Sequence, residues 1–146
     1  MGKSESETTT IIDAQNLILG RMASVIAKRL LEGEKMVVVN AEKAVVSGRR
    51  SSIVKKAEDF LQVGHFRKGP LHVRRPDNIV RKTIRGMVPN KKPRGVQAMK
   101  RLRVFIGVPK GYTIEEKHTI PEIEASSLRC PYITVYEMAR AIGWSD

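Results

Sequence analysis

The side chains with the most chemistry to offer in this sequence are cations, and they are concentrated in the middle of the chain. Residues 49–103 contain seventeen Lys and Arg against three Asp and Glu, a net charge of +14, whereas residues 1–48 are balanced and residues 104–146 carry −2. Guanidinium and ammonium groups at this density bind polyanions, and Arg can hold a phosphate bidentately or stack on an unpaired base. The distribution predicts an RNA-binding surface rather than a solvated charged face.

Three groups of basic residues are expected to carry this surface. They are the loop residues Arg67, Lys68, Arg74 and Arg75, the helix face of Arg81, Lys82 and Arg85, and the cluster of Lys91, Lys92, Arg94, Lys100 and Arg101. Arg49, Arg50, Lys55 and His65 complete the predicted RNA-binding set. Because aromatic residues are scarce here and no RNA-recognition aromatic motif appears, the pattern favours recognition of RNA shape and phosphate position, with binding that weakens steeply with salt.

Catalytic and metal-binding chemistry has weaker support. Gly20 opens a helix after a strand, where a nucleotide phosphate can bind, but no dinucleotide or Walker motif surrounds it, so a tight turn is favoured. His65, His72 and His118 lie in unrelated contexts, and Cys130 is interpreted as an inert packed thiol. No pair of carboxylates has a spacing that suggests acid–base catalysis. We therefore expect no enzyme activity, no metal, no cofactor and no small-molecule substrate.

Composition is typical of one globular domain. The 146 residues are 41% hydrophobic and only 5% aromatic, so aliphatic side chains must build the core. A single cysteine excludes an internal disulfide. No apolar run is long enough to span a membrane, and the N-terminus does not have the pattern of a signal peptide. Both observations favour a cytoplasmic location. A membrane surface is a less favoured polyanion, because no basic helix carries a bulky aromatic face. We expect a flexible tail at residues 1–10 and one α/β domain at 11–146, with a C-terminal extension from about residue 108.

Hydrophobic periodicity predicts strands alternating with helices. A short strand at Ile11 and Ile12 is followed by a helix from Leu19 to about Leu30, which Gly33 ends. The β-branched run Met36–Val39 is typical of a buried strand. This order is that of a β-α-β unit, so we expect the two strands to pair in parallel.

Further elements are predicted along the rest of the chain. They are a strand at Ala44–Val46, a helix capped by Ser51 or Ser52 and running to about Val63, a loop at His65–Arg75, a helix from Pro76 stopped by Pro89, a basic turn at Asn90–Lys92, a helix from Pro93, strands at Val104–Ile106 and Thr119–Ile123, and a final helix from Pro131. For Ile133–Val135 a strand remains an alternative.

Three segments of the chain resemble the L-thirteen family of large-subunit ribosomal proteins. They read IIDAQNLILGRMASVIAKRL at Ile11–Leu30, MVVVNAEKAVVSGR at Met36–Arg49 and TIRGMVPNKKPRGVQAMKRLRVFIG at Thr83–Gly107. The resemblance implies a single three-layer α/β/α domain on a small mixed, mostly parallel sheet, with basic loops and a C-terminal helical extension. It also implies binding to large-subunit rRNA, contact with neighbouring large-subunit ribosomal proteins and a role early in subunit assembly.

The archaeal branch of that family is the closest in character. The stretch Glu32–Lys35 is short where bacterial members carry an insertion, and the segment at His65–Pro70, HFRKGP, resembles archaeal and eukaryotic members. The long C-terminal extension of eukaryotic members is absent from the sequence. The alternative function is an extra-ribosomal RNA-binding regulator of translation, which the same basic residues would serve.

Overall fold

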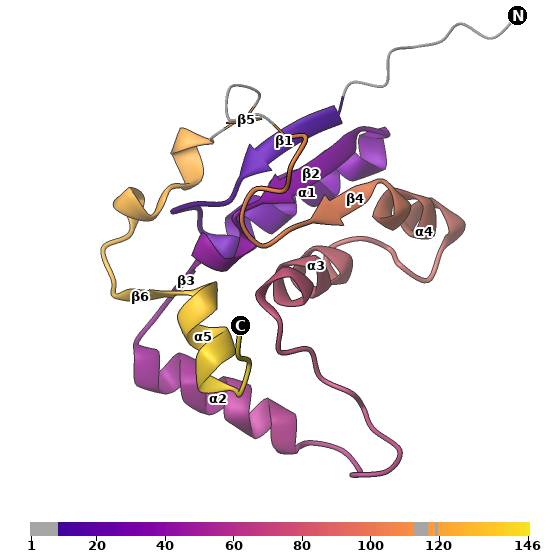
Figure 1. Cartoon of the computed structure of the whole chain (residues 1–146). Coiled ribbons are helices and arrows are strands. Elements are labelled where there is room, and N and C mark those ends of the chain that lie inside the picture. The colour runs from indigo at the N-terminus through magenta and orange to yellow at the C-terminus, as the bar shows by residue number, and fades with distance from the viewer. Residues whose placement is uncertain (1–8, 113–116, 119) are drawn as a thin grey trace, which may run out of the picture.

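A parallel four-stranded sheet forms the centre of the molecule. The structure is a computed structural model that describes residues 9–112, 117–118 and 120–146. The strands β1 (Thr9–Asp13), β2 (Lys35–Val39), β4 (Leu102–Val104) and β5 (Lys117–His118) lie in the order β4-β2-β1-β5. All three pairings are parallel, with Ile11 opposite Val37 and Val37 opposite Arg103. The α/β class with a mostly parallel sheet is therefore confirmed (Figure 1).

Helix α1 (Leu19–Glu32) connects β1 to β2 and completes the expected β-α-β unit. Gly33 ends the helix at a φ of 103°, a left-handed conformation that a residue without Cβ adopts at little cost. Its N–H donates to the carbonyl of Leu30, and the N–H of Glu34 donates to that of Arg29. A short turn then leads directly into β2, so no further segment is inserted between α1 and β2.

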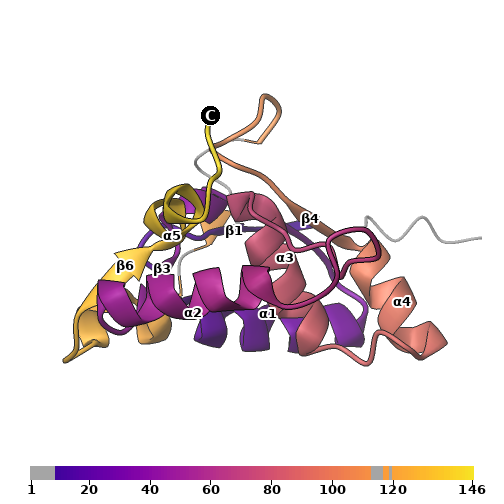
Figure 2. The ribbon, with the colours of Figure 1, turned by 90° about the horizontal axis from the view of Figure 1, so that it is seen from below.

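One face of the sheet carries the main core. Helices α1, α3 (Pro76–Gly86) and α4 (Pro93–Lys100) pack against it, and Figure 2 shows α1 and α3 on the same side of the sheet. Ile12 and Val38 from the sheet meet Ile26 from α1 and Ile84 from α3, all fully buried. Both α3 and α4 begin with proline, whose missing N–H has no helical partner in the first turn. Both starts were expected from the sequence.

The opposite face of the sheet is covered by an irregular segment. Ile11, Val37 and Val39 pack there against the half-buried rings of Phe105 and Tyr112, whose centroids lie 5.8 Å apart. These aromatic residues lie in the irregular segment after β4. This face is therefore covered by a loop segment, whereas the family resemblance implies a layer of helices. In the described part of the chain, two large rings and no helix shield these three aliphatic side chains.

A second, two-stranded sheet joins the C-terminal part to the body. Strand β3 (Val45–Ser47) pairs antiparallel with β6 (Tyr132–Thr134), and α5 (Val135–Ala141) follows directly. The Thr134 hydroxyl accepts a hydrogen bond of 3.2 Å from the N–H of Glu137 and so caps α5. The expected helix start at Pro131 is wrong, and the strand alternative is correct up to Thr134. The C-terminal helical extension itself is confirmed.

Helix α2 (Arg50–Gln62) lies at the edge of the molecule, next to α5 (Figure 1). It contributes no fully buried residue. The expected serine cap is wrong, because α2 starts at Arg50 and Arg49 occupies the N-cap position without a side-chain hydrogen bond. Its start and end are set by the connections to β3 and to the following loop.

Other boundaries differ from the expectations by two or three residues. Helix α3 ends at Gly86, three residues before Pro89, and β4 starts at the buried Leu102, two residues before the predicted strand. In the described part of the chain, short 3-10 turns occupy Ala41–Lys43, Pro121–Ile123 and Ala125–Ser127. The second of these replaces the strand predicted at Thr119–Ile123, of which Thr119 lies outside the described residues.

Two further expectations concern the ends and the environment of the chain. Of the tail expected at residues 1–10, residues 1–8 lie outside the described part, and Thr9 and Thr10 belong to β1. Among the described helices, none has the length and apolar character that a membrane crossing requires.

Candidate nucleic-acid interface

The predicted basic residues belong to four consecutive elements on one side of the molecule. In Figure 1 α2, the loop after it, α3 and α4 fill the lower and right parts of the view, and the acidic segment around residues 121–127 lies at the upper left. Every predicted RNA-binding residue in these elements is exposed except Arg101, which is half-buried. We call the exposed Lys and Arg side chains of residues 49–100 the basic surface.

A hollow between α3 and α4 brings two of the predicted groups together. It has a volume of about 340 Å³ and is lined by Arg81, Arg85, Asn90, Val96, Met99 and Lys100. Val80 and Ile84 hold one side of α3 in the core, so Arg81 and Arg85, one turn apart, point away from it. Two guanidinium groups and one ammonium group therefore surround a single concave site that a phosphate group can enter.

The connection between α3 and α4 is held by close backbone packing. Gly95 is buried in α4, and a Cβ added there would overlap the carbonyl group of Pro89. Pro89 accepts a hydrogen bond of 3.0 Å from the N–H of Lys92, and the Asn90 side chain donates to the carbonyl of Arg85. The basic turn 90–92 and the start of α4 are thereby fixed relative to α3. Such positioning lets cations meet phosphates without further ordering.

Arg101 is tied to the protein itself. Its Nη2 donates a hydrogen bond of 2.8 Å to the carbonyl oxygen of Leu30, near the C-terminal end of α1. Its Nε is buried and has no hydrogen-bond partner in the described part of the chain. The sequence groups Arg101 with the RNA-binding residues, whereas its contacts in the structure join the end of α4 to α1.

The loop between α2 and α3 carries the other basic group. His65 and Gly69 exchange two backbone hydrogen bonds of 3.0 and 2.9 Å, which close a tight turn around Arg67 and Lys68. Figure 1 shows this loop extending beyond the end of α2, away from the sheet. The loop group and the α3–α4 hollow are thus separate parts of the basic surface.

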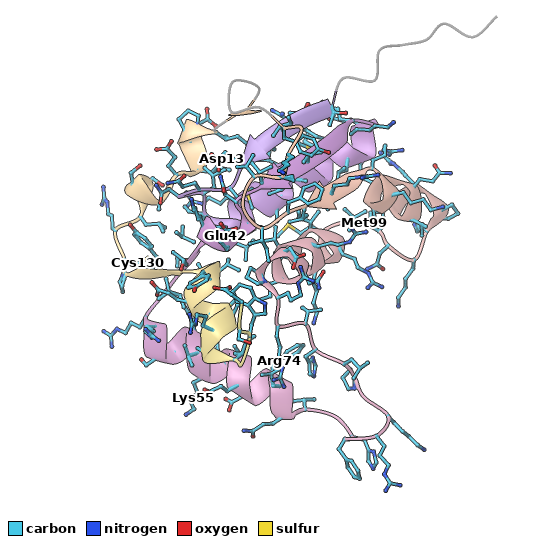
Figure 3. All side chains as sticks on the ribbon, in the orientation of Figure 1. Asp13, Glu42, Lys55, Arg74, Met99 and Cys130 are labelled. Atoms are coloured by element: carbon cyan, nitrogen blue, oxygen red, sulfur yellow. The ribbon has the colours of Figure 1, made fainter. Side chains whose placement is uncertain are left out.

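Few carboxylates compensate the basic surface. Within the described ranges, its one ion pair joins Arg75 to Asp77 at 3.2 Å, and the Arg75 side chain is 60% exposed. Lys82 lies 4.6 Å from the ring centroid of Phe60, a cation–π contact between α3 and α2. Lys55 projects from α2, and Arg74 lies between α2 and α3 (Figure 3). Arg81 also donates a hydrogen bond of 3.4 Å from Nη1 to the carbonyl of Leu102, which keeps its charge unpaired.

The other candidates from the sequence are placed in less reactive settings. The described residues contain no group of three His, Cys, Asp or Glu that could hold a metal ion. His72 contacts the carbonyl of Val63 at 3.2 Å and packs on Phe60 at the end of α2. Cys130 is exposed, so its expected packing in the interior is wrong. Gly20 lies in the first turn of α1 with open space around it.

One ionisable side chain outside the basic surface has a shifted pKa. Arg140 donates a hydrogen bond of 3.0 Å to the hydroxyl of Tyr136, and this contact raises the pKa of Arg140 above its ordinary value. The Tyr136 ring also packs edge-on against Trp144, 5.7 Å away. These contacts fasten the last residues of the chain to α5, and the guanidinium stays charged.

Two features of the interface were not anticipated from the sequence. Asn90 lines the α3–α4 hollow, and Phe66 is 87% exposed at the tip of the loop. The position of Asn90 between Pro89 and Lys91, in a basic turn, is the signal that could have drawn attention to it. Nothing in the local pattern distinguishes an exposed phenylalanine from a core one.

Comparisons with known proteins agree with the resemblance seen in the sequence. The family described as Ribosomal protein L13 matches residues 7–111. Large ribosomal subunit protein uL13 of Methanopyrus kandleri is 43% identical over 145 residues, covering 96% of this chain and 90% of the relative. The proteins of the same name from Methanosarcina barkeri and Saccharolobus solfataricus are 44% and 37% identical, covering 92% and 99% of this chain and 97% and 99% of their own.

These relatives are archaeal, as the short Glu32–Lys35 connection and the HFRKGP segment indicated. The match extends through the four elements that carry the basic surface and, in the relatives, into the C-terminal part. The chain belongs to the Ribosomal protein L13 family of the large ribosomal subunit.

Proposed function

We propose that the chain is an architectural protein of the large subunit that binds large-subunit rRNA through its basic surface. The observation that carries this proposal is the α3–α4 hollow, where Arg81, Arg85 and Lys100 surround one concave site. In the described part of the chain none of these three cations forms an ion pair. Charges left uncompensated in this way are suited to the phosphates of a folded RNA.

The chemistry of the side chains fits phosphates better than bases. Arginine can bind a phosphate with two parallel hydrogen bonds, and lysine adds a compact charge. Helices α3 and α4 hold these groups on a packed core, so their spacing is fixed before RNA arrives. A rigid array of cations recognises how phosphates are arranged in space, which depends on the fold of the RNA.

The same surface supports a role in assembly. Segments of rRNA repel one another, and neutralising their phosphates releases counterions and lowers the cost of packing them together. The relatives that resemble this chain are named as large-subunit proteins, which supports large-subunit rRNA as the partner. Binding early, before other RNA segments close over the site, would let the protein fix local RNA structure.

Neighbouring ribosomal proteins are a second class of partner. Helix α2 has no fully buried residue, and Phe60 and Val63 on it and after it are 50% and 61% exposed. Apolar side chains left open at the edge of a small protein are typical of surfaces that another macromolecule covers. We infer that α2 is covered when the protein is in the subunit.

The test is the salt dependence of binding to deproteinised large-subunit rRNA. The double variant Arg81→Glu/Arg85→Glu is compared with Lys43→Glu/Lys110→Glu, which makes the same change in net charge at exposed positions outside the basic surface. Each lost phosphate contact should reduce the slope of log K against log salt by about one unit at most. We expect the first variant to lose affinity and up to about two units of slope, and the second to lose little.

Equal losses in the two double variants would contradict the proposal, because the effect would then follow net charge and not the α3–α4 site. Unfolding midpoints measured for both variants separate a loss of binding from a loss of folding.

A further inference from the structure

The tip of the loop between α2 and α3 has a geometry that phosphate binding does not explain. The rings of His65 and Phe66 are stacked, with centroids 4.9 Å apart and planes 21° from parallel. The guanidinium of Arg67 lies 5.3 Å from the Phe66 centroid. Three consecutive residues thus bring two aromatic rings and a planar cation together at one end of the molecule.

Local hydrogen bonds hold this arrangement in place. His65 and Gly69 exchange two backbone hydrogen bonds, which close the turn. The N–H of Arg67 donates to Nδ1 of His65 at 3.2 Å and so orients the imidazole ring. The tip is a short closed turn whose rings are positioned by the chain itself.

The tip of the loop exposes large apolar side chains to water, which is unfavourable unless a partner covers them. Phe66 is 87% exposed and Leu71, on the return side of the loop, is 96% exposed. In the described part of the chain, the ring contacts of Phe66 are with His65 and Arg67. A hollow of about 480 Å³ lies beside the turn and is lined by residues 61–66, 69–72 and 74. Because the Phe66 ring is largely exposed and lines this hollow, there is room beside it for a flat group.

The charge around the tip selects the kind of partner. Arg67 and Lys68 are exposed and have no carboxylate partner within the described ranges. A flat aromatic surface beside uncompensated cations matches an unpaired nucleotide, whose base stacks and whose phosphate is anionic. An apolar protein surface would leave both cations without a partner and is less favoured.

We propose that the loop tip binds an unpaired base of large-subunit rRNA, with the base stacked on Phe66 and the adjoining phosphates held by Arg67 and Lys68. This proposal rests on the rRNA binding inferred above and adds a base contact to a surface otherwise suited to phosphates. The contact would give the protein a fixed point on a single-stranded loop or bulge, the form in which RNA exposes its bases.

The test compares full-length variants in binding to deproteinised large-subunit rRNA. Phe66→Leu keeps an apolar side chain and removes the ring, Phe66→Tyr keeps the ring, and Val108→Ala is the control at an exposed apolar position outside the loop. Loss of stacking on one base should weaken binding about 5- to 150-fold in Phe66→Leu, with an unchanged salt slope because no charge is lost. Phe66→Tyr and Val108→Ala should bind within about twofold of the original chain.

A fluorescence measurement reports stacking directly. The chain has a single tryptophan, Trp144, so a Phe66→Trp variant adds one probe at the tip and the original chain provides the control. We expect rRNA to quench the added fluorescence of the variant and to leave that of Trp144 nearly unchanged.

The outcomes separate this proposal from the function on which it rests. If the original chain binds rRNA and Phe66→Leu binds equally tightly, the stacking proposal is overturned and rRNA binding stands. If Phe66→Leu binds rRNA normally but fails to enter assembled subunits, the tip meets a protein and the proposal is likewise overturned. If the original chain does not bind rRNA at all, both fall.

Discussion

Arg101 and Leu30, separated by 71 positions in the sequence, are joined by a hydrogen bond of 2.8 Å from the guanidinium Nη2 to the main-chain carbonyl oxygen. The Leu30 carbonyl, in the last turn of α1, also accepts a hydrogen bond from the N–H of Gly33. Carbonyls at the C-terminal end of a helix carry partial negative charge, so a cation placed there is stabilised. This bond joins the end of α4 to the end of α1, and it leaves the main-chain N–H and C=O of Arg101 to pair with Ala98 and Met36.

We expect Arg101→Ala to destabilise the fold by about 1.5–3 kcal/mol, the range for a hydrogen bond to a charged group. Urea denaturation measures this change. The matched variant Lys100→Ala, at the exposed neighbouring position, should change the free energy of unfolding by less than about 0.5 kcal/mol.

In RNA binding we expect the opposite order: Lys100→Ala should have the larger effect and Arg101→Ala the smaller. Lys100→Ala removes a cation from the α3–α4 hollow and should reduce the salt slope by about one unit at most, whereas Arg101→Ala should leave the slope unchanged. A reduced slope for Arg101→Ala in a folded protein would show that its guanidinium reaches RNA after all.

Among the described glycines, Gly95 has the least space for a side chain. Because a Cβ there would overlap the Pro89 carbonyl, Gly95→Ala must push α4 away from the end of α3. We expect a loss of about 1–3 kcal/mol, as for other overpacked sites. Gly20→Ala is the control, since its Cβ would meet nothing within 4 Å and its helical position favours alanine by up to about 1 kcal/mol. Thermal unfolding of the two variants should shift in opposite directions.

Thr134 begins α5 by accepting the hydrogen bond from the N–H of Glu137. Thr134→Ala should cost about 0.5–2 kcal/mol, while Thr134→Ser, which keeps the hydroxyl, should cost less. The measurement is the midpoint of chemical unfolding. If alanine and serine had equal effects, packing of the threonine methyl group, and not the cap, would be the cause.

Much of the main sheet could be predicted because its signals are local. The apolar period of α1, the glycine that ends it and the β-branched run of β2 each act within a few residues, and together they define a β-α-β unit. The starts of α3 and α4 at Pro76 and Pro93 follow from the missing proline N–H. The concentration of charge in residues 49–103 likewise indicated which elements would form the basic surface.

Wrong boundaries, and features that the sequence did not indicate, arise where structure depends on distant partners. Strands β3 and β6 have three residues each and pair with one another, with Val46 opposite Ile133. The residues next to each strand in the sequence therefore could not predict where it begins and ends. The hydrogen bond of Arg101 could not be foreseen, because its acceptor is a carbonyl at the far end of another helix. The exposure of Phe66 depends on a loop that leaves the core, and local hydrophobicity predicts the opposite.

The most direct test of the account is the reactivity of lysine side chains in the free protein and in assembled large subunits. Lys68, Lys91, Lys92 and Lys100 are all exposed in the free chain, so each should be acetylated readily there, as measured by mass spectrometry of the digested protein. In the subunit we expect these four to be strongly protected and to recover their reactivity after ribonuclease digestion. Unchanged reactivity in the intact subunit would show that the basic surface faces solvent, and would contradict rRNA binding through it.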